Sequence, residues 1–451
     1  MPRTKSRFLI PHKFFLAILG LTAGALPVWA QELPPQSPPA PTLNAADTAW
    51  LLTATTLVLF MTLPGLALFY GGLVRKKNVL SVIIQCLAIS ALATVLWLVA
   101  GYSLAFTDGG AANPFIGGFS RLLFAGMGKL SLTGTVPESL FASFQMTFAI
   151  ITPALITGAY AERMRFPAVL WFSCLWLMVV YVPVAHWVWG GGWLNKLGLM
   201  DFAGGVVVHI TAGVASLVAA LMLGKRRGFP KTVMAPHNLT LVAAGGGMLW
   251  VGWFGFNGGS ALAADGSASM ALLATHISAA AGAATWMFYE WRRFGMPTAL
   301  GTLTGMVAGL GTITPASGFV GPGGALIIGG LAGVVCFHAV QIVKRTLHID
   351  DALDVFPVHG VGGIMGTMLT GVFASTSLGV FAGQGFTMGT HTMAEQLAVQ
   401  ALGVVSVAAY TAAATWGILW AVGKITPLRV PPEMETDGLD LGSHEEQGYN
   451  L

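Results

Sequence analysis

Charged residues are scarce in this sequence: aspartate, glutamate, lysine and arginine make up 9% of its 451 residues. A soluble domain carries about 25% charged residues. Because 55% of the residues are also hydrophobic, the composition excludes an ordinary soluble domain and indicates an integral membrane protein. The formal net charge of +4 does not indicate nucleic-acid binding, since most of the positive charge falls in short loops between apolar runs.

Cysteine is scarce as well. Cys86, Cys174 and Cys336 lie far apart in separate apolar runs, so the sequence has neither a disulfide framework nor a closely spaced metal or redox motif. We interpret the three as small buried hydrophobic residues. The sequence also has no nucleophile–base pattern and no cofactor-binding loop, and it therefore indicates neither an enzyme nor a protein that depends on a metal or a cofactor.

The first 46 residues differ from the rest of the chain. Residues 1–30 combine a basic leader, an apolar segment and a small-residue end at Ala30, a pattern typical of a secretory signal peptide. A retained first helix is the alternative. Residues 31–46 are rich in proline and alanine without an apolar period, and we expect them to form an extended, exported linker.

Residues 47–425 are predicted to form a membrane domain, because their apolar runs are long enough to cross a bilayer. We place eleven spans near 49–74, 79–106, 138–160, 166–189, 201–223, 238–256, 268–290, 298–314, 323–343, 356–374 and 394–425. The runs at 298–314 and 356–374 are short and rich in glycine, so their boundaries are soft. The predicted fold class is an all-α polytopic membrane protein with eleven transmembrane helices.

The loop charges set the orientation. With the mature N-terminus outside, fifteen cations fall in the inward loops and three in the outward loops, which is a strong positive-inside bias. The inward ones are Arg75, Lys76, Lys77, Arg163, Arg165, Lys225, Arg226, Arg227, Lys231, Arg292, Arg293, Lys344, Arg345, Lys424 and Arg429; the outward ones are Arg121, Lys129 and Lys196. The sequence therefore predicts an extracytoplasmic N-terminus and a cytoplasmic C-terminus in the cell (inner) membrane.

Spans one to five and six to ten can be laid over each other as an inverted repeat. Asp201 precedes His209 in the fifth span, and Asp354 precedes His359 in the tenth, which runs the opposite way. Inverted repeats place the pathway of a transporter at the interface between the halves. The eleventh span lies outside the repeat, and we expect it to act as a brace.

The two histidines are predicted to lie deep in the bilayer, about 12 Å into the fifth span for His209. An ionisable side chain at such a depth is expensive and therefore a functional candidate. A lone histidine in an apolar helix is more often a satisfied core residue, but His209 and His359 occupy matching places in the two halves. Burial disfavours imidazolium, so neutral rings are expected, able to bind a small polar solute or to relay a proton. A metal site is disfavoured because no cysteine or third histidine shares the spacing.

Aromatic residues cluster near the outer ends of several spans. Phe144 and Phe148 are four apart and therefore share a helix face, whereas Trp189, Trp253 and Phe256 lie in two tryptophan-rich strings. Tryptophans at span ends are often interface anchors. The alternative is a cation site, because aromatic faces attract ammonium-type cations and a hydroxyl such as that of Ser260 can accept a hydrogen bond.

Asp201 and Asp354 are open to two interpretations. Each carboxylate could bind an entering cation, or it could cap the start of a helix by accepting backbone N–H groups. The glycine-rich context of Asp201 favours the cap.

These strings together resemble the ammonium transporter (Amt/Mep/Rh) family, particularly its bacterial Amt type. The matching strings are DTAWLLTATTLVLFMTLPGLALFYGGLVRKKNVL, AERMRF, AHWVWGGG, DFAGGVVVHI, PHNL, GWFGFNGGS, TPASGFVGPGGALIIG and DVFPVHG. They extend from Asp47 to the last span, so the resemblance covers nearly all of the predicted mature chain.

The resemblance implies roles for residues at matching positions. It assigns ammonium recruitment to Trp189, Phe148, Ser260 and Phe144, a phenyl gate to Phe148 and Phe256, the pore to His209, His359 and Trp253, and a structural or deprotonating role to Asp201 and Asp354. It also implies a homotrimer with one pore per subunit. A PII signal protein is the implied partner at the cytoplasmic face.

Residues 426–451 are polar and acidic, a composition typical of a solvated, disordered end. The segment resembles the family's regulatory tail and keeps Gly438-Leu439-Asp440, although the string from His444 to Tyr449 departs from the familiar ending. Regulation through this tail is expected, and binding of PII is left open.

The expected function is ammonium transport. Ammonium is recruited by the aromatic site and deprotonated, and ammonia crosses the apolar pore along the two histidines; separate transfer of the proton is left open. An ammonium sensor that signals through its tail and a passive channel for ammonia or another gas are the alternatives.

Overall fold

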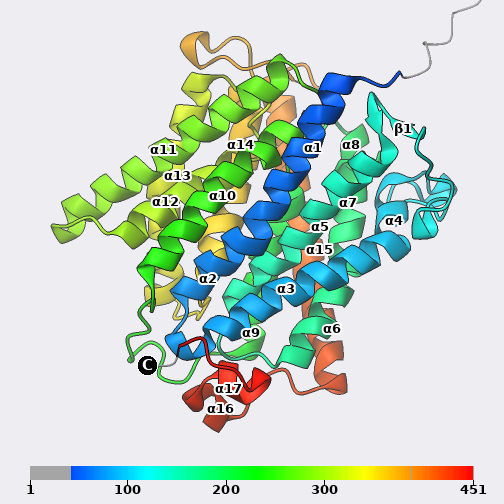
Figure 1. Ribbon diagram of the computed structural model, residues 1–451. Coiled ribbons are helices and arrows are strands. Elements are labelled where there is room, and N and C mark those ends of the chain that lie inside the picture. Colours follow the sequence, from blue (N-terminus) through cyan, green and yellow to red (C-terminus); the bar gives the residue numbers. More distant parts are fainter. Residues whose placement is uncertain (1–41, 387–388, 450–451) are drawn as a thin grey trace, which may run out of the picture. The chain divides into compact units, whose positions relative to one another are not determined.

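The computed structural model describes residues 42–386 and 389–449, which form a bundle of long helices (Figure 1). The predicted signal peptide and residues 31–41 of the predicted linker lie outside the described residues. Residues 45 and 46 of that linker already belong to the first helix, α1 (Ala45–Phe60), whose N–H groups at Ala46 and Asp47 are capped by Asn44.

Within the described residues, ten helical segments are long and apolar enough to cross a membrane. They are Ala45–Leu73, Lys76–Phe106, Glu138–Tyr160, Phe166–Lys196, Gly205–Leu223, Leu239–Gly259, Gly266–Phe294, Pro322–Thr346, Phe356–Phe373 and Met393–Ile425. The shorter apolar helix α12 (Ala299–Ile313) matches the remaining predicted span and, at 15 residues, is about 22 Å long. The predicted all-α polytopic membrane fold is confirmed.

Several spans in the first half change from α-helix to a wider π-helical turn. The first consists of α1, η1 (Met61–Leu66) and α2 (Ala67–Leu73), and the second of η2 (Lys76–Asn78), α3 (Val79–Leu96), η3 (Trp97–Gly101) and α4 (Tyr102–Phe106). The third is α5 (Glu138–Tyr160), the fourth α6 (Phe166–Trp176), η6 (Leu177–Tyr181), α7 (Val182–Val188) and α8 (Trp193–Lys196), and the fifth η7 (Gly205–Ile210) and α9 (Thr211–Leu223). Pro64 lies inside η1 and lacks the N–H group that a regular helix requires there.

The second half consists of α10 (Leu239–Gly259), α11 (Gly266–Phe294), α12, α13 (Pro322–Gln341), η8 (Ile342–Thr346), η9 (Phe356–Gly360) and α14 (Val361–Phe373). The last span, α15 (Met393–Ile425), contacts α6 and α9 of the first half and α14 of the second. Gln400 on α15 donates to the carbonyl oxygens of Met200 and Thr367, at 2.8 and 2.9 Å. This span therefore braces the two halves.

The two histidine-bearing helices cross at glycines. A side chain at Gly213 on α9 would meet the backbone of Gly360 at the end of η9, so the two backbones lie in direct contact there. Such close approach is typical of small residues in membrane bundles. It brings the π-helical turns that carry His209 and His359 side by side.

Short elements fill the loops at the end opposite the C-terminal tail. They are the 3₁₀ turns η4 (Gly110–Ala112), η5 (Leu122–Phe124) and η10 (Gly379–Phe381), and strand β1 (Leu132–Thr133) paired antiparallel with β2 (Val136–Pro137). The ion pair between Arg121 and Glu138, at 2.7 Å, joins this loop region to the start of α5.

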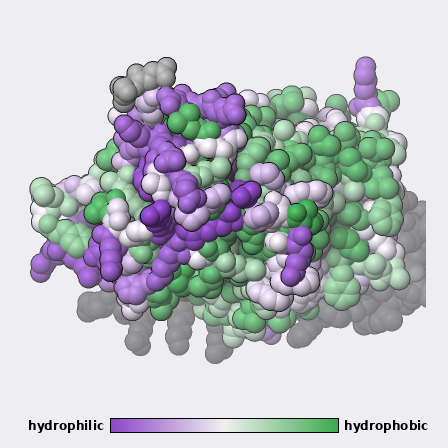
Figure 2. Space-filling model, turned by 90° about the horizontal axis from the view of Figure 1, so that it is seen from below, coloured by the Kyte–Doolittle hydropathy of each residue, from purple (hydrophilic) through white to green (hydrophobic). Residues whose placement is uncertain are grey.

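The tail is folded, in contrast to the disorder that its composition suggests. Helices α16 (Pro432–Asp437) and α17 (Leu439–His444) lie against the loops at the lower end of the bundle (Figure 1). The carboxylate of Asp440 accepts the N–H groups of Leu80 and Ser81, at 3.1 and 2.8 Å, and so caps the start of α3. Seen from below, this end has a gathered hydrophilic region beside a broad hydrophobic surface (Figure 2).

Candidate functional site

Asp201 caps the helix that carries His209. One carboxylate oxygen accepts the N–H groups of Gly204 and Gly205, at 2.9 and 2.6 Å, and the other accepts those of Val206 and Val207, at 2.8 and 3.1 Å. The side chain is buried, and both oxygens are occupied by the backbone. This geometry is that of a helix cap, and it leaves the carboxylate little capacity to bind a passing cation.

The matching cap in the second half is Asp351. Its Oδ2 atom accepts the N–H of Phe356 at 2.7 Å, whereas Asp354 forms an ion pair with Lys344 at 2.8 Å. Burial and the neighbouring Asp354 raise the pKa of Asp351 to about 6. The sequence pattern pointed to Asp354 and not to Asp351, although Asp351 precedes His359 by the same eight positions by which Asp201 precedes His209.

The two histidines form a direct hydrogen bond. Their Nδ1 atoms are 3.1 Å apart, and the rings are stacked with centroids 5.2 Å apart and planes 15° from parallel. Only 1% of His209 and 5% of His359 is exposed, so neutral rings are favoured. One Nδ1 must then donate and the other accept, and the Nε2 atom of His209 has no partner among the described residues.

The lumen beside the histidines is narrow and mostly apolar. It encloses about 10 Å³ and is lined by His209, His359, Trp253, Phe256 and apolar side chains, which is space for about one water-sized molecule. The indole of Trp253 stacks on His209 with centroids 5.6 Å apart, and its N–H donates to Thr314 Oγ1 at 2.9 Å. The tryptophan ring is therefore fixed as one wall of this lumen.

Two phenylalanines close one end of the lumen. The rings of Phe148 on α5 and Phe256 on α10 have centroids 4.4 Å apart, and 1% of each residue is exposed. Phe144, one helical turn from Phe148, packs edge-on against it at 5.0 Å. Because Phe144 is fully buried, it supports the Phe148 ring from behind.

A larger cavity, here called the Trp189 vestibule, lies on the far side of these rings. It has a volume of about 200 Å³, and its lining includes Phe148, Trp189, Gln145 and Ser260. The indole N–H of Trp189 donates to the carbonyl oxygen of Asp201 at 2.9 Å, so the capping loop also orients this tryptophan. The Ser260 hydroxyl donates to its own helix at Phe256, and its oxygen can still accept from a ligand.

A second cavity, the Lys344 cavity, adjoins His359 from the opposite side. It has a volume of about 190 Å³, and its lining includes Tyr70, Lys344, Asp354 and His359. His359 lines both this cavity and the narrow lumen. The Trp189 vestibule, the phenyl pair, the histidine lumen and the Lys344 cavity are therefore neighbours in this order, here called the path, because Phe148, Phe256 and His359 link each one to the next.

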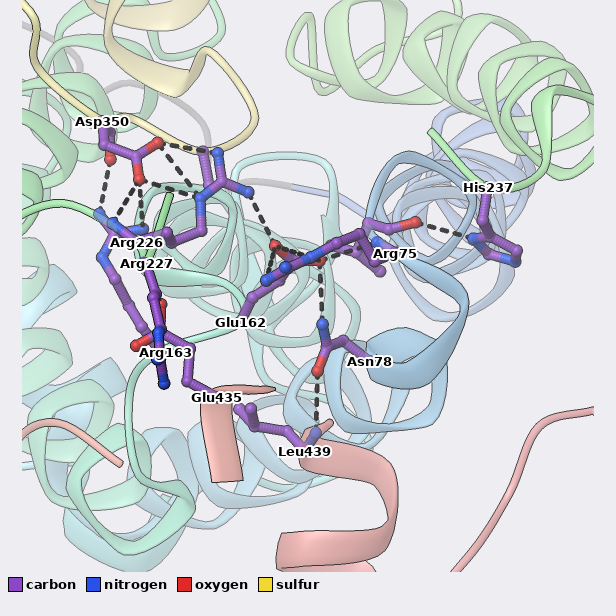
Figure 3. Close-up of polar contacts among 12 residues, drawn as sticks. Arg75, Asn78, Glu162, Arg163, Arg226, Arg227, His237, Asp350, Glu435 and Leu439 are labelled. Atoms are coloured by element: carbon purple, nitrogen blue, oxygen red, sulfur yellow. Dashed lines mark hydrogen bonds and ion pairs between the residues drawn. The ribbon is translucent and has the colours of Figure 1, made fainter. Parts of the chain in front are cut away.

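A buried charge network lies at the tail end of the path (Figure 3). Glu162 accepts from Asn78 at 2.9 Å and forms ion pairs with Arg75 and Arg226, both at 2.9 Å, while Arg226 also pairs with Asp350 at 2.8 Å. Although burial opposes ionisation, these cations hold the pKa of Glu162 at about 2. The network joins loops from both halves of the membrane domain.

The tail connects to this network. The side-chain oxygen of Asn78 accepts the N–H of Leu439 at 2.8 Å, while its amide donates to Glu162 (Figure 3). Glu435 accepts from the Arg227 backbone at 2.6 Å and pairs with Arg429 at 2.8 Å. The structure thus places the folded tail in contact with the loops that carry Asn78 and Arg227.

The family model of the Ammonium Transporter Family matches residues 49–449. The chain belongs to this family. A relative named ammonium transporter from Bacillus subtilis is 46% identical over 409 residues, which are 90% of this chain and 99% of the relative. An ammonium transporter of Aquifex aeolicus is 46% identical over 412 residues, which cover 91% and 94% of the two chains.

Solved structures of the family share the fold. The crystal structure of Mep2 from Saccharomyces cerevisiae has a TM-score of 0.78 and 38% identity, over 87% of this chain and 91% of that one. A structure named Sensor Amt Protein has a TM-score of 0.81 and 29% identity, over 88% and 98% of the two chains. Like the other family members, this chain is a multi-pass membrane protein, and its function is ammonium transport.

The described residues contain no group of three or more histidine, cysteine, aspartate or glutamate side chains that could hold a metal ion. The three cysteines are free thiols, and Cys86 and Cys336 are buried.

Proposed function

We propose that ammonium enters from the Trp189 vestibule, loses a proton at the phenyl pair and crosses the histidine lumen as ammonia. The observation that carries this proposal is the hydrogen-bonded pair of His209 and His359 in a lumen with space for about one water-sized molecule. Such a lumen suits a small neutral solute that can donate and accept hydrogen bonds.

Recruitment rests on the aromatic and hydroxyl groups of the vestibule. The rings of Phe148 and Trp189 stand edge to face with centroids 5.8 Å apart, and each offers a π face that attracts an ammonium ion. The hydroxyl oxygen of Ser260 supplies a hydrogen-bond acceptor beside them. The helix cap of Asp201 contributes indirectly, because its carbonyl oxygen holds the Trp189 indole.

Deprotonation follows from the cost of dehydration. An intact cation gains no compensating charge in a lumen lined by apolar side chains and neutral imidazoles, and burial of an unpaired charge is expensive. Ammonium can avoid this cost by releasing a proton before Phe148 and Phe256, whereas potassium cannot. The same chemistry therefore gives both permeation and selectivity.

The tautomers of the histidine pair make a relay of the released proton feasible. With one Nδ1 donating and the other accepting, one Nε2 carries a proton and the other is free. The pair can accept a proton at the free nitrogen and release one at the opposite end. We propose that this transfer accompanies ammonia, so that net charge crosses the membrane.

We also propose the cell (inner) membrane as the location, with the Trp189 vestibule outside and the tail in the cytoplasm. The charge bias of the loops supports this orientation. The family resemblance supports a homotrimer and a PII signal protein at the tail face. There the folded tail offers a defined surface through α16 and α17.

The test is a current measurement on the purified protein in sealed proteoliposomes. A pulse of ammonium should give a transient current, and an equal pulse of potassium should give none. Internal alkalinisation or acidification, followed with a trapped dye, distinguishes ammonia flux from charge transfer. Ammonia flux without current would favour the passive gas channel over the proton-coupled transporter.

A sensor is the second candidate function, because the tail is folded onto the inner loops through Asn78 and Asp440. Uptake by a transport-deficient host, measured with the full chain and with residues 427–451 removed, separates the two functions. A transporter restores growth on low ammonium. A sensor gives little uptake and loses its signalling output when the tail is removed.

A further inference from the structure

His186, at the end of α7, lies between two acceptors. Its Nδ1 atom is 2.9 Å from the carbonyl oxygen of Ala105, and its Nε2 atom is 2.6 Å from that of Asn113. The side chain is fully buried. A backbone carbonyl oxygen can only accept a hydrogen bond, and a neutral imidazole has only one N–H. A neutral His186 would therefore turn a nitrogen lone pair toward one of these carbonyl oxygens, at 2.6 or 2.9 Å depending on the tautomer.

His237 provides a contrast within the same molecule. Its Nδ1 atom is 2.8 Å from the carbonyl oxygen of Val74, but its Nε2 atom faces the hydroxyl of Tyr449 at 2.9 Å. A hydroxyl can donate as well as accept, so a neutral ring satisfies both contacts. Among the described histidines with both ring nitrogens hydrogen-bonded, His186 is the one whose partners are both carbonyl oxygens.

We propose that His186 carries both ring protons in the folded protein and, as an imidazolium, positions Trp189 in the recruitment vestibule. The helix end supports this charge, since His186 lies in the last turn of α7, where the carbonyl groups favour a cation. The short contact with Asn113 suits a charge-assisted hydrogen bond. The role in recruitment rests on the proposed transport function; the protonation state does not.

The surroundings of His186 contain few groups that could compete with this assignment. The titratable side chains on the packed elements are Tyr102 on α4, Tyr181 in η6, Lys196 on α8, His209 in η7 and Tyr410 on α15, and Asp108 belongs to the adjoining loop. No hydrogen bond or ion pair joins any of them to His186 in the described part of the chain. The two carbonyl dipoles and the helix end are therefore its direct electrostatic partners.

The imidazolium fastens the loop after α4 to the segment that carries Trp189. Its two donors hold the last turn of α4 at Ala105 and the following loop at Asn113, and its own carbonyl oxygen accepts the N–H groups of Gly190 and Gly192, each at 3.0 Å. Gly190 and Gly192 lie within three residues after Trp189, so His186 holds the backbone that follows this tryptophan. Loss of one ring proton would release either α4 at Ala105 or the loop at Asn113 and so loosen the vestibule wall.

The protonation state can be measured directly by nitrogen NMR on the full-length protein in lipid. The dipeptide Ala185-His186 is the only Ala-His pair in the sequence, so carbonyl-¹³C alanine combined with ¹⁵N histidine assigns His186 without any mutation. We expect both ring nitrogens of His186 to carry a proton at pH 7.5, whereas His237 has one protonated and one bare nitrogen. A bare nitrogen on His186 at this pH would overturn the proposal.

The positioning role has a separate readout. His186→Gln replaces two widely spaced donors with one amide, and we expect it to raise the KM for ammonium about tenfold, the loss of one hydrogen bond to a charged group, with less change in the maximal current. His237→Gln is the matched control and should leave KM within about twofold. An unchanged KM in folded His186→Gln protein would refute the positioning role. If NMR shows two ring protons on His186 but the native protein gives no ammonium current, the proposed transport function is refuted and the proposed protonation state is not.

Discussion

Replacement of Asp201 by asparagine tests whether this carboxylate is a helix cap. Each oxygen of Asp201 accepts two backbone N–H groups, at distances between 2.6 and 3.1 Å. Asparagine keeps one oxygen and turns an NH₂ group toward the other two amides. Two buried donors therefore lose their acceptor and face a third donor, while the size of the side chain is unchanged.

The expected loss follows from the two orphaned amides. A buried N–H without an acceptor costs about 1–3 kcal/mol, so Asp201→Asn should reduce the free energy of unfolding by about 2–6 kcal/mol. In a protein of this size that corresponds to a fall in Tm on the order of 5 °C. Because the Trp189 indole is held by the Asp201 carbonyl, we also expect weaker recruitment of ammonium.

Asp351→Asn is the matched control. Only one oxygen of Asp351 accepts a hydrogen bond, from Phe356, and its Oδ1 atom has no partner among the described residues. Asparagine can keep that bond and place its NH₂ group at the Oδ1 position, which accepts no hydrogen bond from the described residues. We expect the Tm to stay equal or rise slightly, since the substitution also removes a buried charge.

The assay is thermal unfolding of the purified protein in detergent, followed by tryptophan fluorescence and by loss of the monodisperse peak on size exclusion. A native Tm for Asp201→Asn, combined with loss of ammonium binding, would refute the cap and restore the cation ligand. Equal losses of Tm for both variants would show that removal of any buried carboxylate at these loops is harmful.

Three further predictions concern the tail end of the molecule. Glu162→Gln should lower the free energy of unfolding by about 3 kcal/mol, because it leaves the buried Arg226 with one counter-charge fewer. The folded pKa of Glu162 is about 2, below its usual 4.5. Native protein should therefore lose this stabilisation as the pH falls from about 4.5 toward 2, which chemical denaturation at stepped pH would measure. Asp351 has a folded pKa of about 6, above its usual 3.8. Its ionisation should therefore destabilise the native state increasingly as the pH rises from about 4 through 6, by up to about 3 kcal/mol. The Tm of Asp351→Asn relative to native protein should rise between pH 4.5 and pH 7.5, and a constant difference would contradict the raised pKa of Asp351. Asp440→Asn removes one acceptor for the start of α3, and limited proteolysis should cut its tail about tenfold faster than the native tail; equal rates would show that Asp440 does not hold the tail.

Much of the membrane domain follows from hydrophobic patterning. The apolar runs predicted the spans within a few residues, because a bilayer imposes a minimum length on each helix. The lengths did not reveal the π-helical turns, such as those that carry His209 and His359, because a wider turn needs no distinctive residue. The spacing of glycines likewise suggested close packing without showing that Gly213 would meet Gly360.

The site residues were found where two chemically unusual residues recur in matching contexts. His209 and His359 were paired from sequence because ionisable residues are rare in such helices, and the structure brings their rings into contact. The partner of Asp201 was harder to choose, because Asp350, Asp351 and Asp354 crowd one short loop. The structure identifies Asp351 as the partner, because its carboxylate accepts the N–H of Phe356 at the first turn of η9.

The tail and His186 depend on long-range contacts that no local pattern encodes. The acidic composition of residues 426–451 resembles that of a disordered end, yet Asp440 finds two free N–H groups at the start of a helix some 360 positions earlier in the sequence. His186 lies in one of the matching strings but had no assigned role, because its partners Ala105 and Asn113 come from α4 and the loop after it, more than 70 positions earlier in the sequence.

The most direct test of the central claim is the ammonium-induced current of a double variant, His209→Ala with His359→Ala, in proteoliposomes of matched protein content. Removal of both imidazoles deletes the hydrogen-bonded pair that the lumen encloses, and the account predicts that the ammonium-coupled current disappears. A current equal to that of the native protein would contradict the proton relay.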